Sequence, residues 1–189
     1  MSDPGSPMTT TTDDDAPSVP QQYFGKYRGV VVNNIDPEQR GRIMALVPDV
    51  STVIPTTWAM PCLPVLGLQL GVFTVPMIGA GVWIEFEHGD PDYPIWTGCF
   101  PGSLADVPIA AKVVPPLVPA VTVQTPLQNS IVVSDMPPTP ATGGIVLSST
   151  TKAMIVVNDS GIYISNGKGA MITLVGPTVT INNGALVVV

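Results

Sequence analysis

The chain has 189 residues with 14 acidic and 7 basic side chains, a net charge of −7 and a positive mean hydropathy of +0.38. Its 22 prolines and 18 glycines disfavour long helices and favour short strands joined by turns, which predicts an all-β fold. Seven cations argue against a nucleic-acid partner, because phosphate binding depends on clustered lysines and arginines.

Membrane-spanning and metal-binding classes are also disfavoured. The most apolar stretches, 113–123 and 145–157, are interrupted by prolines or polar residues, and neither offers the roughly 20 apolar residues of a spanning helix. The first residues lack the basic start and apolar core of a signal peptide, so we expect synthesis in the cytoplasm without Sec export. Cys62 and Cys99 belong to no CxxC or Cys/His cluster, which predicts buried free thiols and no metal or other cofactor.

The composition divides the chain into segments. Residues 1–22 carry the threonine run Thr9–Thr12 and the aspartate run Asp13–Asp15, and they offer too little apolar surface for a core. We expect this segment to be a flexible acidic N-terminal arm. Residues 23–106 contain all three tryptophans, both cysteines and the single histidine, and they form the expected globular domain.

Valine-rich segments between turn residues predict five short strands in this domain, at 28–34, 42–48, 72–76, 81–87 and 94–100. The first two flank a turn at Asp36–Gly41. In the fourth strand, alternation places Val82, Ile84 and Phe86 on one face, which we expect to be the core side. Five short antiparallel strands without an amphipathic helix are typical of an OB-type barrel.

The C-terminal half has two different patterns. Residues 107–143 carry eight prolines among valines, which favours an extended connector because proline cannot donate to a sheet ladder. In residues 144–189, four glycines spaced by seven or eight residues separate short apolar segments: Gly161, Gly169, Gly176 and Gly184. This spacing predicts a repeat of strand and turn.

Residues 144–189 contain only three charged side chains and are too few to form a sufficient core alone. Their strands need partners for both edges and apolar faces. We therefore expect an intertwined β-helix or β-prism made from several copies of the chain. The pattern alone also allows a dimer or a single-chain solenoid.

Several motifs together resemble a known family: Tyr27–Pro37, Gly41–Ile43, Trp58–Ala59 and Gly81–Gly98. In this order they are similar to the OB domain of phage baseplate spike proteins and the related Vgr proteins of type VI secretion, over residues 23–100. The glycine-punctuated tail is similar to the β-helical needle of those proteins. Some members of this family hold an iron ion with a His-x-His motif. We expect no iron site in this chain, because His88 is its only histidine.

The resemblance implies a structural, non-enzymatic homotrimer. Such a trimer is the central spike of a contractile tail or injection system, assembled into a virion or injection-particle baseplate. It links the tail hub to a tip protein and pierces the target envelope, contacting the membrane only during penetration. For the hub contact we expect the cations Lys26, Arg28, Arg40 and Arg42. For a PAAR-type tip protein we expect the apolar residues Leu186, Val187, Val188 and Val189.

Two alternative functions attach to residues of the barrel. The acidic residues Glu85, Glu87, Asp90 and Asp92 would suit a cell-wall hydrolase if one carboxyl were desolvated and another stayed ionised. Trp83 and Trp96 would suit an OB-fold carbohydrate- or nucleic-acid-binding module if they formed a stacking platform. We expect instead a solvated acidic turn, and tryptophans that pack against neighbouring subunits.

Overall fold

The computed structural model describes residues 21–188, so nearly all of the expected acidic arm lies outside the described residues. The chain divides between Phe100 and Pro101 into two compact units. Strands dominate both units, which confirms the predicted all-β class. Within residues 21–188, no helix has the length and apolar character needed to cross a membrane.

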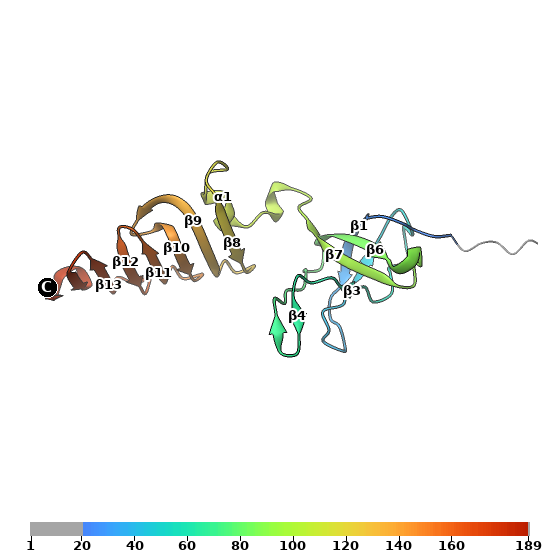
Figure 1. Ribbon diagram of the computed structural model, residues 1–189, viewed down its shortest axis with the longest axis horizontal. Coiled ribbons are helices and arrows are strands. Elements are labelled where there is room, and N and C mark those ends of the chain that lie inside the picture. The colour runs from blue at the N-terminus through green and yellow to red at the C-terminus, as the bar shows by residue number, and fades with distance from the viewer. Residues whose placement is uncertain (1–20, 189) are drawn as a thin grey trace, which may run out of the picture. The chain divides into compact units, whose positions relative to one another are not determined.

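The N-terminal unit is built on a five-stranded sheet in the order β2-β1-β6-β7-β3 (Figure 1). Its strands are β1 (Tyr27–Asn33), β2 (Met44–Leu46), β3 (Met60–Pro61), β6 (Gly81–Phe86) and β7 (Pro94–Phe100). Ile43, just before β2, and Ala59, just before β3, exchange backbone hydrogen bonds of 3.2 and 2.7 Å. Because this pair links the two outer strands, the sheet closes into a small barrel of the predicted OB type.

The barrel core confirms the alternation predicted for β6. Val82 and Ile84 are fully buried and Phe86 is 7% exposed. They pack with residues from the other strands and the adjoining segments: Val31, Ile43, Ala45, Val47, Ala59 and Trp96. The Nε1 of Trp96 donates to the carbonyl oxygen of Gly41 at 3.0 Å, which anchors the largest ring of the core.

The turn between β1 and β2 is organised by the buried carboxylate of Asp36. Its oxygens accept hydrogen bonds from the backbone N–H groups of Glu38, Arg40 and Arg42 at 3.0, 2.8 and 3.3 Å. The Arg42 guanidinium donates two more, at 3.1 and 2.7 Å, and lies over the ring of Trp58. The hydrogen bond from the Arg42 side chain holds the pKa of Asp36 far below its usual range, against the opposing effect of burial. The turn predicted at this position is confirmed.

Replacing Asp36 with asparagine is expected to destabilise the N-terminal unit at neutral pH and to flatten its dependence on acid. Because the folded-state pKa is depressed, the carboxylate contributes fully above the unfolded-state value of about 3.9. That contribution declines as the pH falls below the unfolded-state value, and it is gone once the pH has fallen through the folded-state pKa. Urea unfolding should therefore show a larger drop in stability between about pH 6 and about pH 3 for the wild type than for Asp36→Asn. Asp49→Asn, at an exposed site, is the control, and equal acid dependence in Asp36→Asn and the wild type would contradict this assignment.

Two expectations for the N-terminal unit are wrong. Residues 72–76 form no strand beside β6, because β1 and β7 already occupy both of its sides. The fifth strand is β3, which lies in the proline-rich segment after Trp58. Cys62 and Cys99 are exposed rather than buried, because one directly follows β3 and the other is the second-last residue of β7, where the core side chains end.

The remaining short elements include a two-stranded hairpin, β4 (Leu66–Gly67) with β5 (Leu70–Gly71). The helices of the described residues are all short: η1 (Glu87–Gly89), η2 (Leu104–Asp106), α1 (Ile109–Val113) and η3 (Asn182–Gly184). No long amphipathic helix is present in the described part of the chain, as the proline and glycine content predicts.

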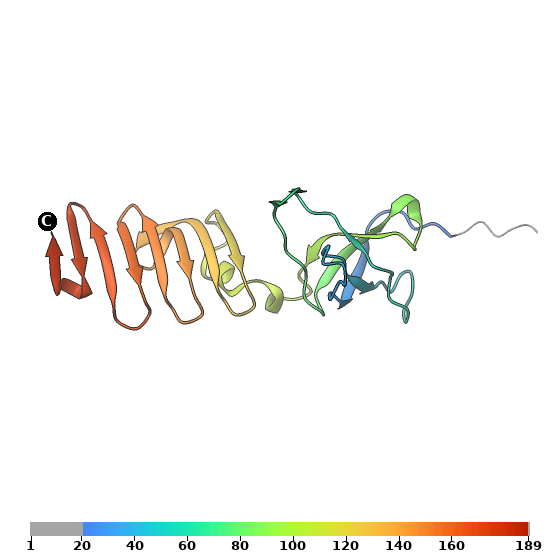
Figure 2. The same cartoon turned by 90° about the horizontal axis from the view of Figure 1, so that it is seen from below.

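The C-terminal unit is an eight-stranded antiparallel sheet whose strands follow one another in chain order (Figure 2). The strands are β8 (Ala120–Gln124), β9 (Ser130–Thr139), β10 (Thr142–Ser148), β11 (Met154–Asn158), β12 (Gly161–Ser165), β13 (Met171–Val175), β14 (Thr178–Ile181) and β15 (Leu186–Val188). The strands predicted between the recurring glycines are confirmed by β12 to β15. Each strand pairs with its neighbours in the same chain, and the weaving of several copies stays a prediction.

Strands β8 and β9 lie within residues 107–143, where the sequence predicts an extended connector outside the sheet. The prolines do not prevent these strands, because they occupy positions without regular pairing. Pro119 precedes β8, Pro126 lies in the turn after it, and Pro137 and Pro138 lie where the register between β9 and β10 shifts. The chain from residue 120 onward therefore belongs to the sheet.

A glycine makes this register shift possible. Gly144 of β10 has φ of +70°, a conformation that side chains with a Cβ rarely adopt. A Cβ at this position would also collide with the backbone carbonyl oxygen of Val157 on β11. The backbones of β10 and β11 can therefore approach closely beside the bulge in β9.

Candidate oligomer interface and partner contacts

One face of the C-terminal sheet consists of two rows of aliphatic side chains that cross all eight strands. Each row is defined by residues directly opposite one another in the strand pairing. The first row is Val123, Ile131, Leu147, Ile155, Ile164, Ile172, Ile181 and Leu186. The second row is Val121, Val133, Ile145, Val157, Ile162, Leu174, Val179 and Val188. We call these sixteen residues the aliphatic face.

The aliphatic face follows from strand alternation. Successive side chains point to opposite sides of a sheet, so Ile162 and Ile164 share one face and Tyr163 lies on the other. The same rule holds in every strand, and the residues between the two rows are more mixed: Thr122, Val132, Val146, Val156, Tyr163, Thr173, Thr180 and Val187. The two faces of the sheet therefore differ in composition.

The aliphatic face is uncovered in a single chain. Fourteen of its side chains are exposed, by 36% to 66%, and Val179 and Ile181 are half-buried. A shallow groove of about 530 Å³ lies on it, lined by the first-row residues from Val123 to Ile164. An apolar surface this continuous is unusual for a monomer and marks an interaction site.

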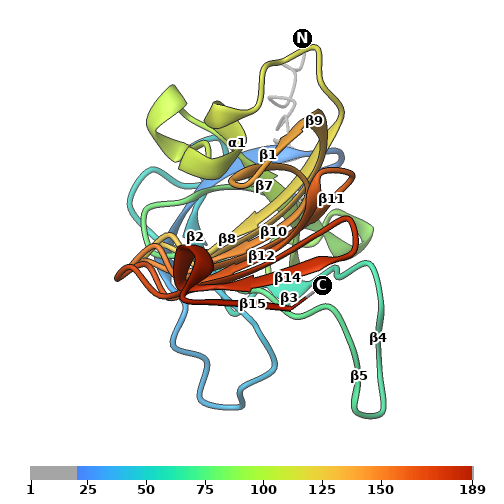
Figure 3. The same ribbon diagram turned by 90° about the vertical axis from the view of Figure 1, so that its left-hand side faces the viewer.

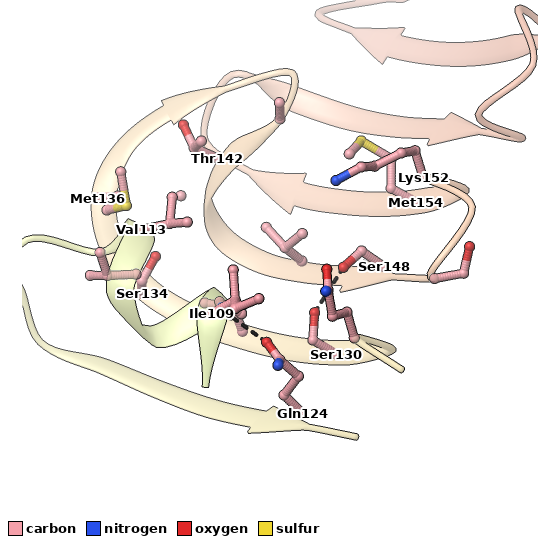
Figure 4. Close-up of a pocket in the computed structure, with 18 of the residues that line it drawn as sticks. Ile109, Val113, Gln124, Ser130, Ser134, Met136, Thr142, Ser148, Lys152 and Met154 are labelled. Atoms are coloured by element: carbon pink, nitrogen blue, oxygen red, sulfur yellow. Dashed lines mark hydrogen bonds between the residues drawn. The ribbon is translucent and has the colours of Figure 1, made fainter. Parts of the chain in front are cut away.

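The opposite face carries a cavity of about 270 Å³ between helix α1 and the neighbouring strands (Figure 4). Ile109 and Val113 line it from the helix, and the side-chain oxygen of Gln124 accepts a hydrogen bond of 2.8 Å from the N–H of Ala110. Its only charged lining residue is Lys152, and none of the described residues around it is a carboxylate, histidine or cysteine. The lining is therefore formed mainly by apolar and uncharged polar side chains.

Three of the four residues expected to bind a tip protein, Leu186, Val187 and Val188, form strand β15 at one edge of this sheet. Leu186 and Val188 continue the two aliphatic rows, opposite Ile181 and Val179, and each is 54% exposed. The side chain of Val187 and all of Val189 lie outside the described residues. Among the strands of residues 21–188, β15 pairs with β14 only, so its other side has no strand partner within this range.

Two of the cations expected at the hub lie at the start of β1. Lys26 donates to Glu85 at 2.7 Å. The Arg28 guanidinium lies over the rings of Trp83 and Phe100, at 5.4 and 5.0 Å from their centroids. Arginine, tryptophan and phenylalanine are all residue types enriched in protein interfaces.

The other two cations lie in the turn after β1, and each pairs with a carboxylate of the same turn. Arg40 pairs with Glu38 at 3.1 Å, and its hydrogen bond is the main cause of the lowered pKa of Glu38. The Arg42 side chain is only 13% exposed, and its hydrogen bond to Asp36 raises its own pKa. The four cations therefore do not form one patch, and Arg42 stabilises its own loop.

The acidic residues lie near the end of β6 and in the turn that follows it. Glu85 is paired with Lys26, and the carboxylate of Asp90 accepts the backbone N–H of Asp92 at 3.0 Å. Glu87, Asp90, Asp92 and the neighbouring His88 are exposed, so no carboxyl among them is desolvated. Within residues 21–188, no three His, Cys, Asp or Glu side chains are grouped to hold a metal ion.

The two tryptophans do not form a stacking platform. Trp96 is 5% exposed and belongs to the core of its own barrel, so the expectation that it packs against a neighbouring subunit is wrong. Its position on the core side of β7 decides this, since it lies directly opposite the buried Ile84. Trp83 is half-buried and contacts Phe100, with 5.0 Å between the ring centroids.

The sequence predicts apolar faces for the strands of residues 144–189, but it misses the four members of the aliphatic face on β8 and β9. Those four members lie in the segment expected to be a connector, and the members on β10 and β11 lie before the first recurring glycine, Gly161. A signal for them exists in the period-two alternation of Val121 with Val123 and of Ile131 with Val133. The alignment of the alternating residues into rows depends on register, which one strand alone does not reveal.

Comparison with known proteins gives two family matches. Residues 27–100 match the type VI secretion system/phage-baseplate injector OB domain, and residues 120–187 match the phage baseplate V C-terminal trimerisation domain. No curated protein matches the chain. The first match covers the barrel from β1 to β7, and the second covers nearly all of the eight-stranded sheet with its aliphatic face. The chain therefore combines an OB domain and a trimerisation domain of the phage-baseplate and type VI secretion injector families.

Proposed function

We propose that this protein is the central spike of a contractile tail or injection system. In this role it is a non-enzymatic homotrimer, made in the cytoplasm and assembled into the baseplate, that links the tail hub to a tip protein and pierces the target envelope. Support comes from the presence of a baseplate OB domain and a trimerisation domain in one chain. The exposed acidic turn, with its ion pair and backbone hydrogen bonds, favours this role over that of a hydrolase.

The observation that carries the proposal is the aliphatic face. In a trimer, three such sheets would form the walls of a prism with their aliphatic faces turned inward. Each Val, Ile or Leu is already partly covered, so its further burial would contribute on the order of 1 kcal/mol. Because every strand contributes two such residues, this stabilisation would extend along the whole sheet and would make the prism stiff.

Each of the two units offers a surface for one partner, the N-terminal unit for the hub and the C-terminal unit for the tip protein. Lys26 and Arg28, with the stacked rings of Trp83 and Phe100, offer the hub a charged and aromatic surface. Arg40 would contribute at the periphery, and Arg42 would support the turn that carries it. At the other unit, a PAAR-type tip protein would cover the free edge of β15 together with Leu186 to Val189.

The mass of the purified full chain in solution tests the proposal. Light scattering is expected to give about 59 kDa, three times the chain mass of 19.7 kDa. A chain ending after Pro119 lacks the eight-stranded sheet and is expected to have the mass of a single chain. A full-length protein that remains soluble at 19.7 kDa would overturn the trimeric spike.

A further inference from the structure

A second uncovered apolar feature lies in the N-terminal unit. The hairpin formed by β4 and β5, which we call the leucine hairpin (Leu66–Gly71), projects from the body of this unit (Figures 1 and 3). All six of its residues are exposed. Leu68, at its turn, is 98% exposed, and Leu66 and Leu70 are 59% and 68% exposed.

The hairpin is apolar on both of its sides. Leu66 lies opposite Gly71, and Gly67 lies opposite Leu70. Adjacent pairs in a hairpin point to opposite faces, so each face presents one leucine beside one glycine. A Cβ at Gly71 would come within 2.6 Å of the carbonyl oxygen of Val65, which explains a glycine at that position. A hairpin packed against its own barrel needs only one apolar side, and this one has two.

The stretch of sequence that contains the hairpin also lacks charged residues. No Asp, Glu, Lys or Arg occurs in residues 50–84, although the segments on both sides carry them. Val65, Val72 and Phe73 at the base of the hairpin are 53%, 59% and 52% exposed. Solvent-exposed leucines in a segment without charged residues indicate a surface that another protein covers.

We propose that the leucine hairpin packs against the N-terminal unit of a neighbouring copy in the trimer. This inference rests on the trimer of the proposed function. The trimerisation domain holds three N-terminal units together, and only residues 101–119 separate the last strand of the barrel from the first strand of the C-terminal sheet. A short tether gives an effective concentration on the order of millimolar. At such a concentration, an apolar hairpin meets a neighbouring copy more often than any other partner.

Rotational symmetry suits this contact. In a three-fold ring each copy gives one surface to the next copy and receives a different one from the previous copy. A projecting hairpin can supply one of these two surfaces, so the contact does not require a second hairpin on the other copy. The ring of hairpins would hold the barrels together and leave the trimerisation domain to set the number of copies.

Photo-cross-linking of the full chain tests this contact. Leu68 is replaced by the photoreactive amino acid p-benzoylphenylalanine, which its 98% exposure makes compatible with folding. Irradiation is expected to give dimers and trimers on a denaturing gel, linked from position 68 to residues 21–100 of another copy by peptide mass spectrometry. The control places the same amino acid at Tyr93, an exposed aromatic position beside Asp92, where no link between chains is expected.

The outcomes separate this inference from the proposed function. Links only within a chain, or none, in a protein with the mass of three chains would overturn the hairpin contact and leave the trimeric spike intact. Such a result would point to the hub or another baseplate protein as the partner of the hairpin. A protein with the mass of one chain would overturn both.

Discussion

Replacing Ile164 with aspartate is expected to convert the trimer into single chains. Ile164 lies in the first row of the aliphatic face, between Ile155 and Ile172 on the adjacent strands. In the proposed prism, three carboxylates would enter an apolar interior, and the effective cost of burying each is several kcal/mol. Light scattering should therefore show a fall in mass from three chains to one.

Two matched variants make this result specific. Ile164→Leu keeps the volume and apolar character of the side chain and should keep the mass of three chains. Leu117→Asp introduces the same charge at a residue that is 96% exposed and outside the sheet, and it should also leave the mass unchanged. A trimer that survives Ile164→Asp would show that the aliphatic face is not the contact between copies.

Replacing Trp96 with alanine is expected to destabilise the N-terminal unit by about 3–5 kcal/mol, because it leaves a large cavity and an unpaired carbonyl at Gly41. For a domain of this size, each kcal/mol lowers the melting temperature by about 4–8 °C. Calorimetry should therefore show a fall of at least about 12 °C in the transition of this unit.

Trp83→Ala is the control, because Trp83 is half-buried and outside the core cluster. Its melting temperature should fall by much less than that of Trp96→Ala. Both variants should keep the mass of the wild type, since the trimerisation domain does not include these residues. A similar loss of stability in the two variants would argue against Trp96 as the centre of the core.

Much of the N-terminal barrel could be predicted because its signals are local. The alternation of Val82, Ile84 and Phe86 identifies the core side of β6, and the residues from Asp36 to Gly41 specify the turn after β1. The choice of the fifth strand could not be predicted in this way. It depends on which edges of β6 and β7 remain free once β1 is paired, and that is a property of the assembled sheet.

The candidate site shows the same limit. Lys26, Arg28, Arg40 and Arg42 are visible as cations in the sequence, but only the folded chain shows which carboxylate or ring each one meets. Likewise, the leucines at 66, 68 and 70 are visible as apolar residues. Their exposure on a projecting hairpin depends on where the barrel places its own core.

The sequence by itself determined the all-β class, the barrel motifs and the glycine-separated strands, because strand alternation and turn chemistry act over a few residues. Only the tertiary structure decided that eight strands pair in chain order and that their aliphatic residues align in two rows. Register across a sheet is set by turns and bulges, such as the one beside Gly144, and a shift of one residue would send each of these side chains to the other face. The surface that we propose unites three copies is therefore a product of register rather than of composition.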